Sequence, residues 1–176
     1  TADELGLNSN EQVYGAAITP DDATAFVTIW GGTRGPATNE TLVVELAGLL
    51  AGDMPDVSWV TTRFTTGGGS DNQLLRISHN GDYLAIVCPD THRVLVVETV
   101  HPYDRLGFYM EDGHENSVSP IDVAWSPDDT AIYVGYLAGP PSSSIGAYGS
   151  VRRCDIDQPD HCGYAVGVQG PVRSID

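Results

Sequence analysis

A segment repeated three times constrains the fold of this chain more than any other feature of its 176 residues. The copies align without gaps, and each has an apolar run, a Ser or Thr, a polar turn and a second apolar run. They are YGAAITPDDATAFVTIW from Tyr14, QLLRISHNGDYLAIVCP from Gln73 and PIDVAWSPDDTAIYVGY from Pro120. Turns built from Asp-Asp or Asn-Gly close β-hairpins. Each copy therefore predicts one hairpin of a larger repeated unit.

Two further β-rich runs follow each hairpin. The third runs are ETLVVELA, HRVLVVETV and GSVRRCDID, whose β-rich parts end on the acids Glu45, Glu98 and Asp155. The fourth runs are VSWVTTRFTT, RLGFYMEDG and CGYAVGVQG. Four short antiparallel strands per unit are typical of a propeller blade. The sequence thus predicts an all-β, partial β-propeller, with blade 1 at about 11–66, blade 2 at about 72–112, blade 3 at about 117–169 and the first strand of a fourth blade at 170–176.

Three blades are fewer than a closed propeller needs, since closed rings have about four to eight. An open stack leaves strand edges and one apolar face uncovered. We therefore expect further blades, from the same or another chain, to complete the ring. The alternative is a small self-sufficient β-sandwich of about 12 or 13 strands.

The third copy carries motifs that resemble the WD40 repeat. DGHENSVSPIDVAWSPDDTAIYVG places a Gly-His pair at Gly113-His114, an apolar strand at Val123 to Trp125 and the characteristic turn at Ser126 to Asp129. Cys154-Asp155 falls where WD40 repeats have Trp-Asp. The Gly-His pair occurs in one copy and Trp-Asp in none, so the resemblance implies the WD40 hydrogen-bond network only around His114 and Ser126.

Shorter motifs are similar to another group of propellers. SPDD and VLVVET resemble the Ser-Pro-Asp-Gly turn and valine-rich third strand of bacterial YVTN and lactonase-type propellers. Together the two resemblances cover about residues 11–176. They imply a propeller and leave the choice between the WD40 and YVTN or lactonase subfamilies open.

The charge balance excludes one class of partner. The chain has 24 acidic and 8 basic residues, a net charge of −16, and every basic residue is arginine. Such a surface repels phosphate backbones, so we expect no nucleic-acid partner. No apolar run approaches the roughly 18 residues of a membrane span, so none is predicted.

The three cysteines suggest an oxidising compartment. Cys154 and Cys162 enclose the polar, turn-forming segment DIDQPDH, which predicts a hairpin with a disulfide between its strands. Disulfides persist in exported proteins, so we expect an extracellular or periplasmic location. A metal site of Cys154, His161 and Cys162 is the alternative, although adjacent His-Cys lacks the usual zinc-ligand spacing. Cys88 lies in an apolar run and is predicted to be a buried, reduced thiol.

No catalytic motif stands out. The chain has no nucleophile elbow, phosphate loop or metalloprotease motif, and no histidine pair at ligand spacing. His79 occupies a turn position and is interpreted as a solvated turn residue. We predict neither catalytic nor metal-binding residues and no cofactor. Calcium or another divalent metal is left open by the acidic runs MEDGHEN and CDIDQPDH.

Propellers display function on loops at the blade ends, and six loops of this chain are expected to share one rim. The loops expected there are Asn8–Glu11, Gly31–Asn39, Gly67–Asn72, Pro89–His92, Gly113–Asn116 and Gly139–Gly149. They carry the candidate binding residues Arg34, Asp71, Asp90, His92, His114 and Glu115. This mostly acidic rim suits a basic or cationic partner.

Two functional hypotheses follow. The first is an exported, non-enzymatic propeller module that binds another protein or closes against further blades. The second is a fragment of a lactonase- or dehydrogenase-like propeller enzyme with a metal or cofactor in the central channel. The lack of a catalytic constellation favours the first hypothesis, and fold alone does not decide between them.

Overall fold

A computed structural model describes the three repeated units and not every loop between them. The described residues are 12–30, 38–46, 60–68, 74–89, 93–100, 104–109, 119–136, 148–158 and 162–169. All twelve elements in these ranges are β-strands. They form three separate four-stranded antiparallel sheets, each built from four strands that are consecutive in the sequence.

The strands follow the order of the repeat. The first sheet, called blade 1, contains β1 (Gln12–Ile18), β2 (Thr24–Trp30), β3 (Thr38–Glu45) and β4 (Val60–Gly68). Blade 2 contains β5 (Leu75–Ile77), β6 (Tyr83–Cys88), β7 (Arg93–Glu98) and β8 (Arg105–Tyr109). Blade 3 contains β9 (Pro120–Trp125), β10 (Ala131–Tyr136), β11 (Tyr148–Asp155) and β12 (Cys162–Gln169).

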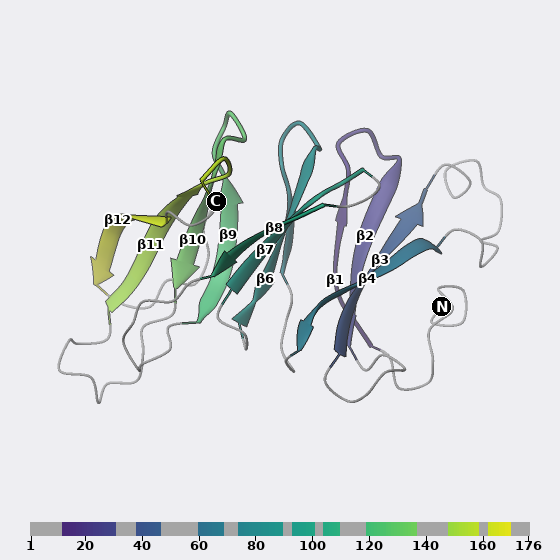
Figure 1. The fold of residues 1–176 in the computed structure, drawn as a ribbon, viewed down its shortest axis with the longest axis horizontal. Coiled ribbons are helices and arrows are strands. Elements are labelled where there is room, and N and C mark those ends of the chain that lie inside the picture. The colour runs from purple at the N-terminus through teal and green to yellow at the C-terminus, as the bar shows by residue number, and fades with distance from the viewer. Residues whose placement is uncertain are drawn as a thin grey trace.

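The three sheets stand side by side in chain order, and their first hairpin turns lie along one edge, at the top of Figure 1. The first strands β1, β5 and β9 adjoin one another across the blades, so they form the inner edge of the array. This is the arrangement of a partial β-propeller. A sandwich of two sheets, the alternative that the sequence left open, is excluded by the three-sheet topology.

The middle blade is buried on both faces. Leu84, Ile86 and Cys88 of β6 join a core with Phe26 and Val43 of blade 1. The intervening Ala85 and Val87 join a second core with blade 3, around Ile132 and Val134. Because successive side chains of a strand point to opposite faces, a strand between two neighbours needs apolar residues at every position. The uninterrupted run YLAIVC of β6 meets this need.

Strand ends match the repeat closely, with one correction. The third strands end on Glu45, Glu98 and Asp155 as predicted. The loops expected at 31–39, 67–72 and 139–149 are shorter than predicted, because strand residues occupy their described ends: Thr38 pairs with Gly68, Asn39 with Gly67 and Gly149 with Val168. The register of the β3–β4 pair shifts between Asn39 and Glu40, as it does at a β-bulge, and glycine can pair through its backbone without a side chain.

Some expectations fall outside the described residues. The strand predicted at 170–176 and the central parts of the six rim loops lie outside the described ranges. In the part of the chain that the structure describes, there is no helix long and apolar enough to cross a membrane.

Candidate functional site

The three hairpin turns have nearly the same hydrogen bonds. We number their four residues 1 to 4: Thr19 to Asp22, Ser78 to Gly81 and Ser126 to Asp129. In each turn the amide of residue 4 donates to the carbonyl of residue 1, at 2.9, 3.0 and 2.9 Å. The hydroxyl of residue 1 accepts from the amide five residues later, at 3.0, 2.9 and 3.0 Å. The turns are therefore structural copies, and differences between them reflect their surroundings.

Residue 3 holds each turn closed through its side chain. Asp128 accepts hydrogen bonds from the hydroxyl of Ser126 at 2.7 Å and from that of Thr130 at 2.8 Å. These bonds, with one from the Thr130 amide, lower the pKa of Asp128 to about 2. Asn80 plays the same part in blade 2, where its Oδ1 accepts from the Ser78 hydroxyl at 2.8 Å.

Residue 4 of the third turn reaches across to the neighbouring blade. The Asp129 carboxylate accepts the amide hydrogens of His79 at 2.9 Å and Asn80 at 2.8 Å, and His79 Nδ1 lies 2.8 Å from its Oδ1. Its side chain is only 7% exposed. Burial raises the pKa of Asp129, but the hydrogen bonds from His79 and Asn80 outweigh it and lower this pKa below 3.8. Asp129 thus binds the turn of blade 2 as a carboxylate.

The turn of blade 2 meets blade 1 differently. Its residue 4 is Gly81, with φ +83°, and a Cβ there would lie 2.9 Å from Cδ of Pro20. Pro20 is residue 2 of the first turn and has no amide hydrogen to donate. An aspartate at position 81 would therefore find neither the space nor the full pair of donors that Asp129 finds. Glycine is the residue that fits this contact.

Blades 2 and 3 are also joined along their inner strands. Trp125 Nε1 donates to the carbonyl of Arg76 at 3.0 Å, and the Trp125 ring stacks on Tyr83 with ring centres 6.1 Å apart. The Arg76 guanidinium lies 3.4 Å from a carboxylate oxygen of Asp122. Arg76 is 42% exposed, so this ion pair contributes little beside the packing of Trp125.

The first strand of blade 1 lacks a comparable cover. Ile18, Val13 and Tyr14 of β1 are 53%, 50% and 41% exposed, although they are large and apolar. Asp22, residue 4 of the first turn, is also exposed. Apolar side chains gathered on one strand mark a surface for another polypeptide more often than scattered ones do. The exposed side of β1, together with Asp22 in the turn that follows this strand, is the candidate functional site that the described residues offer.

The binding residues predicted from the loops are not among those described. Arg34, Asp71, Asp90, His92, His114 and Glu115 all lie outside the described ranges. The acidic rim therefore stays a prediction, as does the network around His114.

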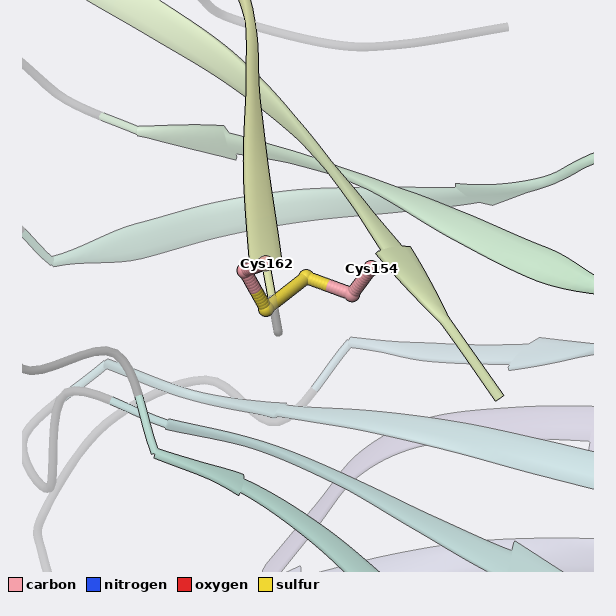
Figure 2. The surroundings of a disulfide bond; sticks show 2 residues. All are labelled: Cys154 and Cys162. Atoms are coloured by element: carbon pink, nitrogen blue, oxygen red, sulfur yellow. A yellow bond between two sulfur atoms is a disulfide. The ribbon is translucent and has the colours of Figure 1, made fainter. Parts of the chain in front are cut away.

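The predicted disulfide is present. Cys154 and Cys162 are direct partners on β11 and β12, with Cα atoms 4.1 Å apart, and their sulfur atoms are bonded (Figure 2). The bond overturns the alternative metal site, because disulfide sulfurs are not thiolate ligands. The prediction for Cys88 is also confirmed: it is a buried thiol outside this bond, and burial raises its pKa to about 11.

The described residues contain no group of three or more His, Cys, Asp and Glu side chains that could hold a metal ion.

One buried polar group lies between blades 2 and 3: the Tyr136 hydroxyl, which accepts and donates no hydrogen bond among the described atoms. The Arg152 guanidinium sits 5.5 Å from the centre of its ring. Burial raises the pKa of Tyr136, so this phenol is neutral and suited to packing.

Sequence reasoning missed the role of the hairpin turns in joining the blades. His79 is solvated as predicted, with 62% of its side chain exposed, yet its backbone and ring both bind Asp129. A signal was available in the aligned turns. Residue 4 is Gly where the preceding turn has Pro at position 2, and Asp where the preceding turn has His.

Comparison by sequence finds no match among protein-family models or curated proteins. Solved structures match its fold. The chain is similar to the Cps50 (Swd1) β-propeller domain of Myceliophteria thermophila, with 9% identity, a TM-score of 0.59 and 92% of this chain covered. It is also similar to the periplasmic gluconolactonase of Pseudomonas aeruginosa, with 15% identity, a TM-score of 0.52 and 92% of this chain covered. A third similar structure is the hydrazine synthase of Kuenenia stuttgartiensis, with 14% identity, a TM-score of 0.52 and 81% of this chain covered.

The matched part is about half of each of these structures: 45%, 55% and 39% of their chains, respectively. The propeller part of the sequence resemblance is thereby confirmed, and the subfamily stays a prediction. At such identities similarity shows a shared architecture and no shared activity. The chain therefore has the fold of a β-propeller.

Proposed function

We propose that the protein is an exported, non-enzymatic propeller module that works by binding another polypeptide. The observation that supports this most directly is the exposure of Ile18, Val13 and Tyr14 on β1. A partner that removes this apolar surface from water stabilises the complex by about 25 cal/mol per Å² of buried area. The Cys154–Cys162 disulfide supports export, because such bonds persist in oxidising compartments.

Photo-crosslinking tests this function. A photoreactive amino acid is placed at Tyr14, and the purified protein is returned to the compartment in which it acts. On illumination it is expected to form an adduct with a polypeptide. The same group at Asp157, exposed on blade 3, is the control and should not. Ile18→Asp should abolish the adduct without unfolding the protein, because Ile18 is already solvated.

Two results would contradict this function. One is equal labelling from positions 14 and 157, which would mean that β1 is no preferred contact. The other is turnover of a lactone or of a redox substrate by the purified chain, since that would favour the enzyme hypothesis.

We propose in addition that the acidic loop rim binds a cationic segment of the partner. The support is the net charge of −16 together with the acids predicted there, Asp71, Asp90 and Glu115. Replacing these three by Asn, Asn and Gln should weaken partner binding and flatten its dependence on ionic strength, because exposed charges are screened by salt. Binding that is equally salt-dependent before and after the substitutions would argue against the rim.

A further inference from the structure

The repeat allows each blade to be compared with the others, and blade 3 departs from them at two positions that lie close together. We propose that Tyr136 and Arg152 form a binding site for a small organic carboxylate between blades 2 and 3. The phenol and the guanidinium are both able to donate hydrogen bonds. The site lies on β10 and β11, apart from the exposed side of β1, so it does not rest on the function proposed above.

The hydroxyl of Tyr136 is a buried polar group without a partner. Counted from the first residue of each hairpin turn, Tyr136 corresponds to Ile29 of blade 1 and Cys88 of blade 2, and all three are buried. The Ile29 side chain has no polar atom, and the Cys88 thiol donates to the carbonyl of Ile86 at 3.8 Å. Tyr136 is 2% exposed, and its hydroxyl has no hydrogen bond within the ranges that the structure describes. An unpaired buried hydroxyl lowers stability, so packing alone would favour phenylalanine here.

Arg152 brings a positive charge to the same place. It is the direct partner of Val134, so its side chain lies on the face of blade 3 that meets blade 2. Val134 corresponds to Ile86 of blade 2, whose direct partner is Leu95, a residue buried in the core between blades 1 and 2. The guanidinium carbon of Arg152 lies 5.5 Å from the centre of the Tyr136 ring. Blade 3 thus has an arginine where blade 2 has a buried leucine, and its charge lies beside the unpaired hydroxyl.

The chemistry of the two side chains selects the ligand. Burial raises the pKa of Tyr136, so its phenol keeps its proton and is able to donate it in a hydrogen bond. The Arg152 guanidinium is planar and always charged, and its N–H groups match the two oxygens of a carboxylate. One guanidinium balances one negative charge, which favours a carboxylate over a doubly charged phosphate. A carboxylate would therefore supply the acceptor that the Tyr136 hydroxyl lacks.

The position of the site in the blade limits the size of the ligand. Tyr136 is the last residue of β10, at the end of the strand farthest from the hairpin turn (Figure 1). Towards the turn, Ile132 and Val134 are 0% exposed and fill the core between the blades. We therefore expect the ligand to enter from the strand end. Because the hydroxyl is buried, a small carboxylate fits this place better than a polypeptide does.

Acetate is the probe for this site. The melting temperature of the oxidised protein is measured near neutral pH at increasing acetate concentration, with sodium chloride keeping the ionic strength constant. A ligand that binds only the folded state raises this temperature according to its occupancy. We expect acetate to stabilise the wild type, and the apparent affinity to fall by roughly tenfold or more in Tyr136→Phe and in Arg152→Leu.

Two matched variants serve as controls. Arg153→Leu removes the neighbouring arginine, which pairs with Asp155 at 2.8 Å and lies on the opposite face of β11. Thr41→Val removes the other buried hydroxyl that lacks a hydrogen bond among the described residues. Both variants should respond to acetate as the wild type does. Equal loss of the acetate effect in Arg152→Leu and Arg153→Leu would overturn the proposal, because it would indicate an effect of net charge.

The stability of Tyr136→Phe without acetate is an independent measurement. Because the hydroxyl has no partner, this variant should be at least as stable as the wild type in acetate-free buffer and less stable than the wild type in saturating acetate. Lower stability in both buffers would mean that the hydroxyl is already paired in the fold, and it would overturn the proposal.

The identity of the ligand is tested with two further compounds at the same ionic strength. Inorganic phosphate should stabilise the wild type less than acetate does, and a short peptide with a free C-terminal carboxylate should bind no more tightly than acetate. Equal stabilisation by phosphate would overturn the assignment to a carboxylate. Tighter binding of the peptide would overturn the assignment to a small molecule, and a wild type that acetate does not stabilise would overturn the site itself.

Discussion

At the scale of single residues, the hydrogen-bonding capacity of the turns decides how the blades join. Asp129 and Asp22 are the same residue type in the same backbone conformation, but only Asp129 has a turn to bind among the described residues. A buried carboxylate bonded to two amides contributes more than an exposed one, because removing it leaves buried donors unpaired.

This difference predicts unequal effects of one substitution at the two sites. Asp129→Asn should lower the free energy of unfolding by about 1.5–3 kcal/mol, the range for hydrogen bonds to a charged group. Asp22→Asn in the same chain should change it by less than about 0.5 kcal/mol, as exposed substitutions do. Urea denaturation followed by tryptophan fluorescence measures both. Equal losses would mean that Asp129 owes its effect to the turn conformation rather than to blade 2.

Acid should weaken the turns. The pKa values of Asp128 and Asp129 are lower in the folded protein than their ordinary value of 3.8. Groups of this kind contribute stability above the unfolded pKa and lose it as the pH falls through the folded pKa. We therefore expect the urea midpoint to fall as the pH is lowered from 3.8 towards about 2, the folded pKa of Asp128.

The matched variant is Asp128→Asn, because Asn80 already serves at this position in blade 2. It should be less stable than the wild type near neutral pH and lose less stability on acidification. An unchanged slope between the two proteins would show that other carboxylates account for the acid sensitivity.

At the scale of strands and hairpins, local pattern and pairing agree. The hairpin β11–β12 illustrates this: polar turn-forming residues between Cys154 and Cys162 predicted both the turn and the disulfide, and both are present. The strand pair β3–β4 shows the limit. Its glycines read as loop, yet Gly67 and Gly68 pair with β3, because backbone hydrogen bonding needs no side chain.

The disulfide should stabilise blade 3 modestly. It joins residues eight apart, and closing so short a loop restrains the unfolded chain by about 2–3 kcal/mol. The double variant Cys154→Ala/Cys162→Ala should therefore melt at a lower temperature than the oxidised wild type. Wild-type protein treated with a reductant should melt at a temperature close to that of the variant. A variant with the same melting temperature as the oxidised wild type would show that the bond contributes nothing to folding stability.

At the scale of the whole molecule, each blade is stabilised mainly by its neighbours. Blade 2 shares one core with blade 1 and another with blade 3. Stability in such arrays is close to a sum of unit and nearest-neighbour contributions. A cavity at one interface should therefore lower the local stability of the two blades that form the interface and leave the third blade nearly unchanged.

Leu84→Ala tests this. Leu84 is fully buried against blade 1, so its truncation should cost about 2–5 kcal/mol. Hydrogen exchange should accelerate in β2 and β6 and remain slow in β10. Ile132→Ala is the control at the other interface and should accelerate exchange in β6 and β10 while sparing β2. Uniform acceleration in all three strands by either variant would indicate a single cooperative unit instead.

The sequence by itself determined the repeated hairpin, the four strands of each unit, the disulfide and the acids that end the third strands. These features depend on period-2 patterning and turn chemistry, which act between residues close in the chain. Only the tertiary structure decided that Asp129 is buried while Asp22 is exposed, and that Trp125 is covered while Ile18 is not. The physical reason is that burial and hydrogen-bond partners at these repeated positions come from a neighbouring sheet. A strand's own pattern shows which residues share a face, and it does not say whether another blade covers that face.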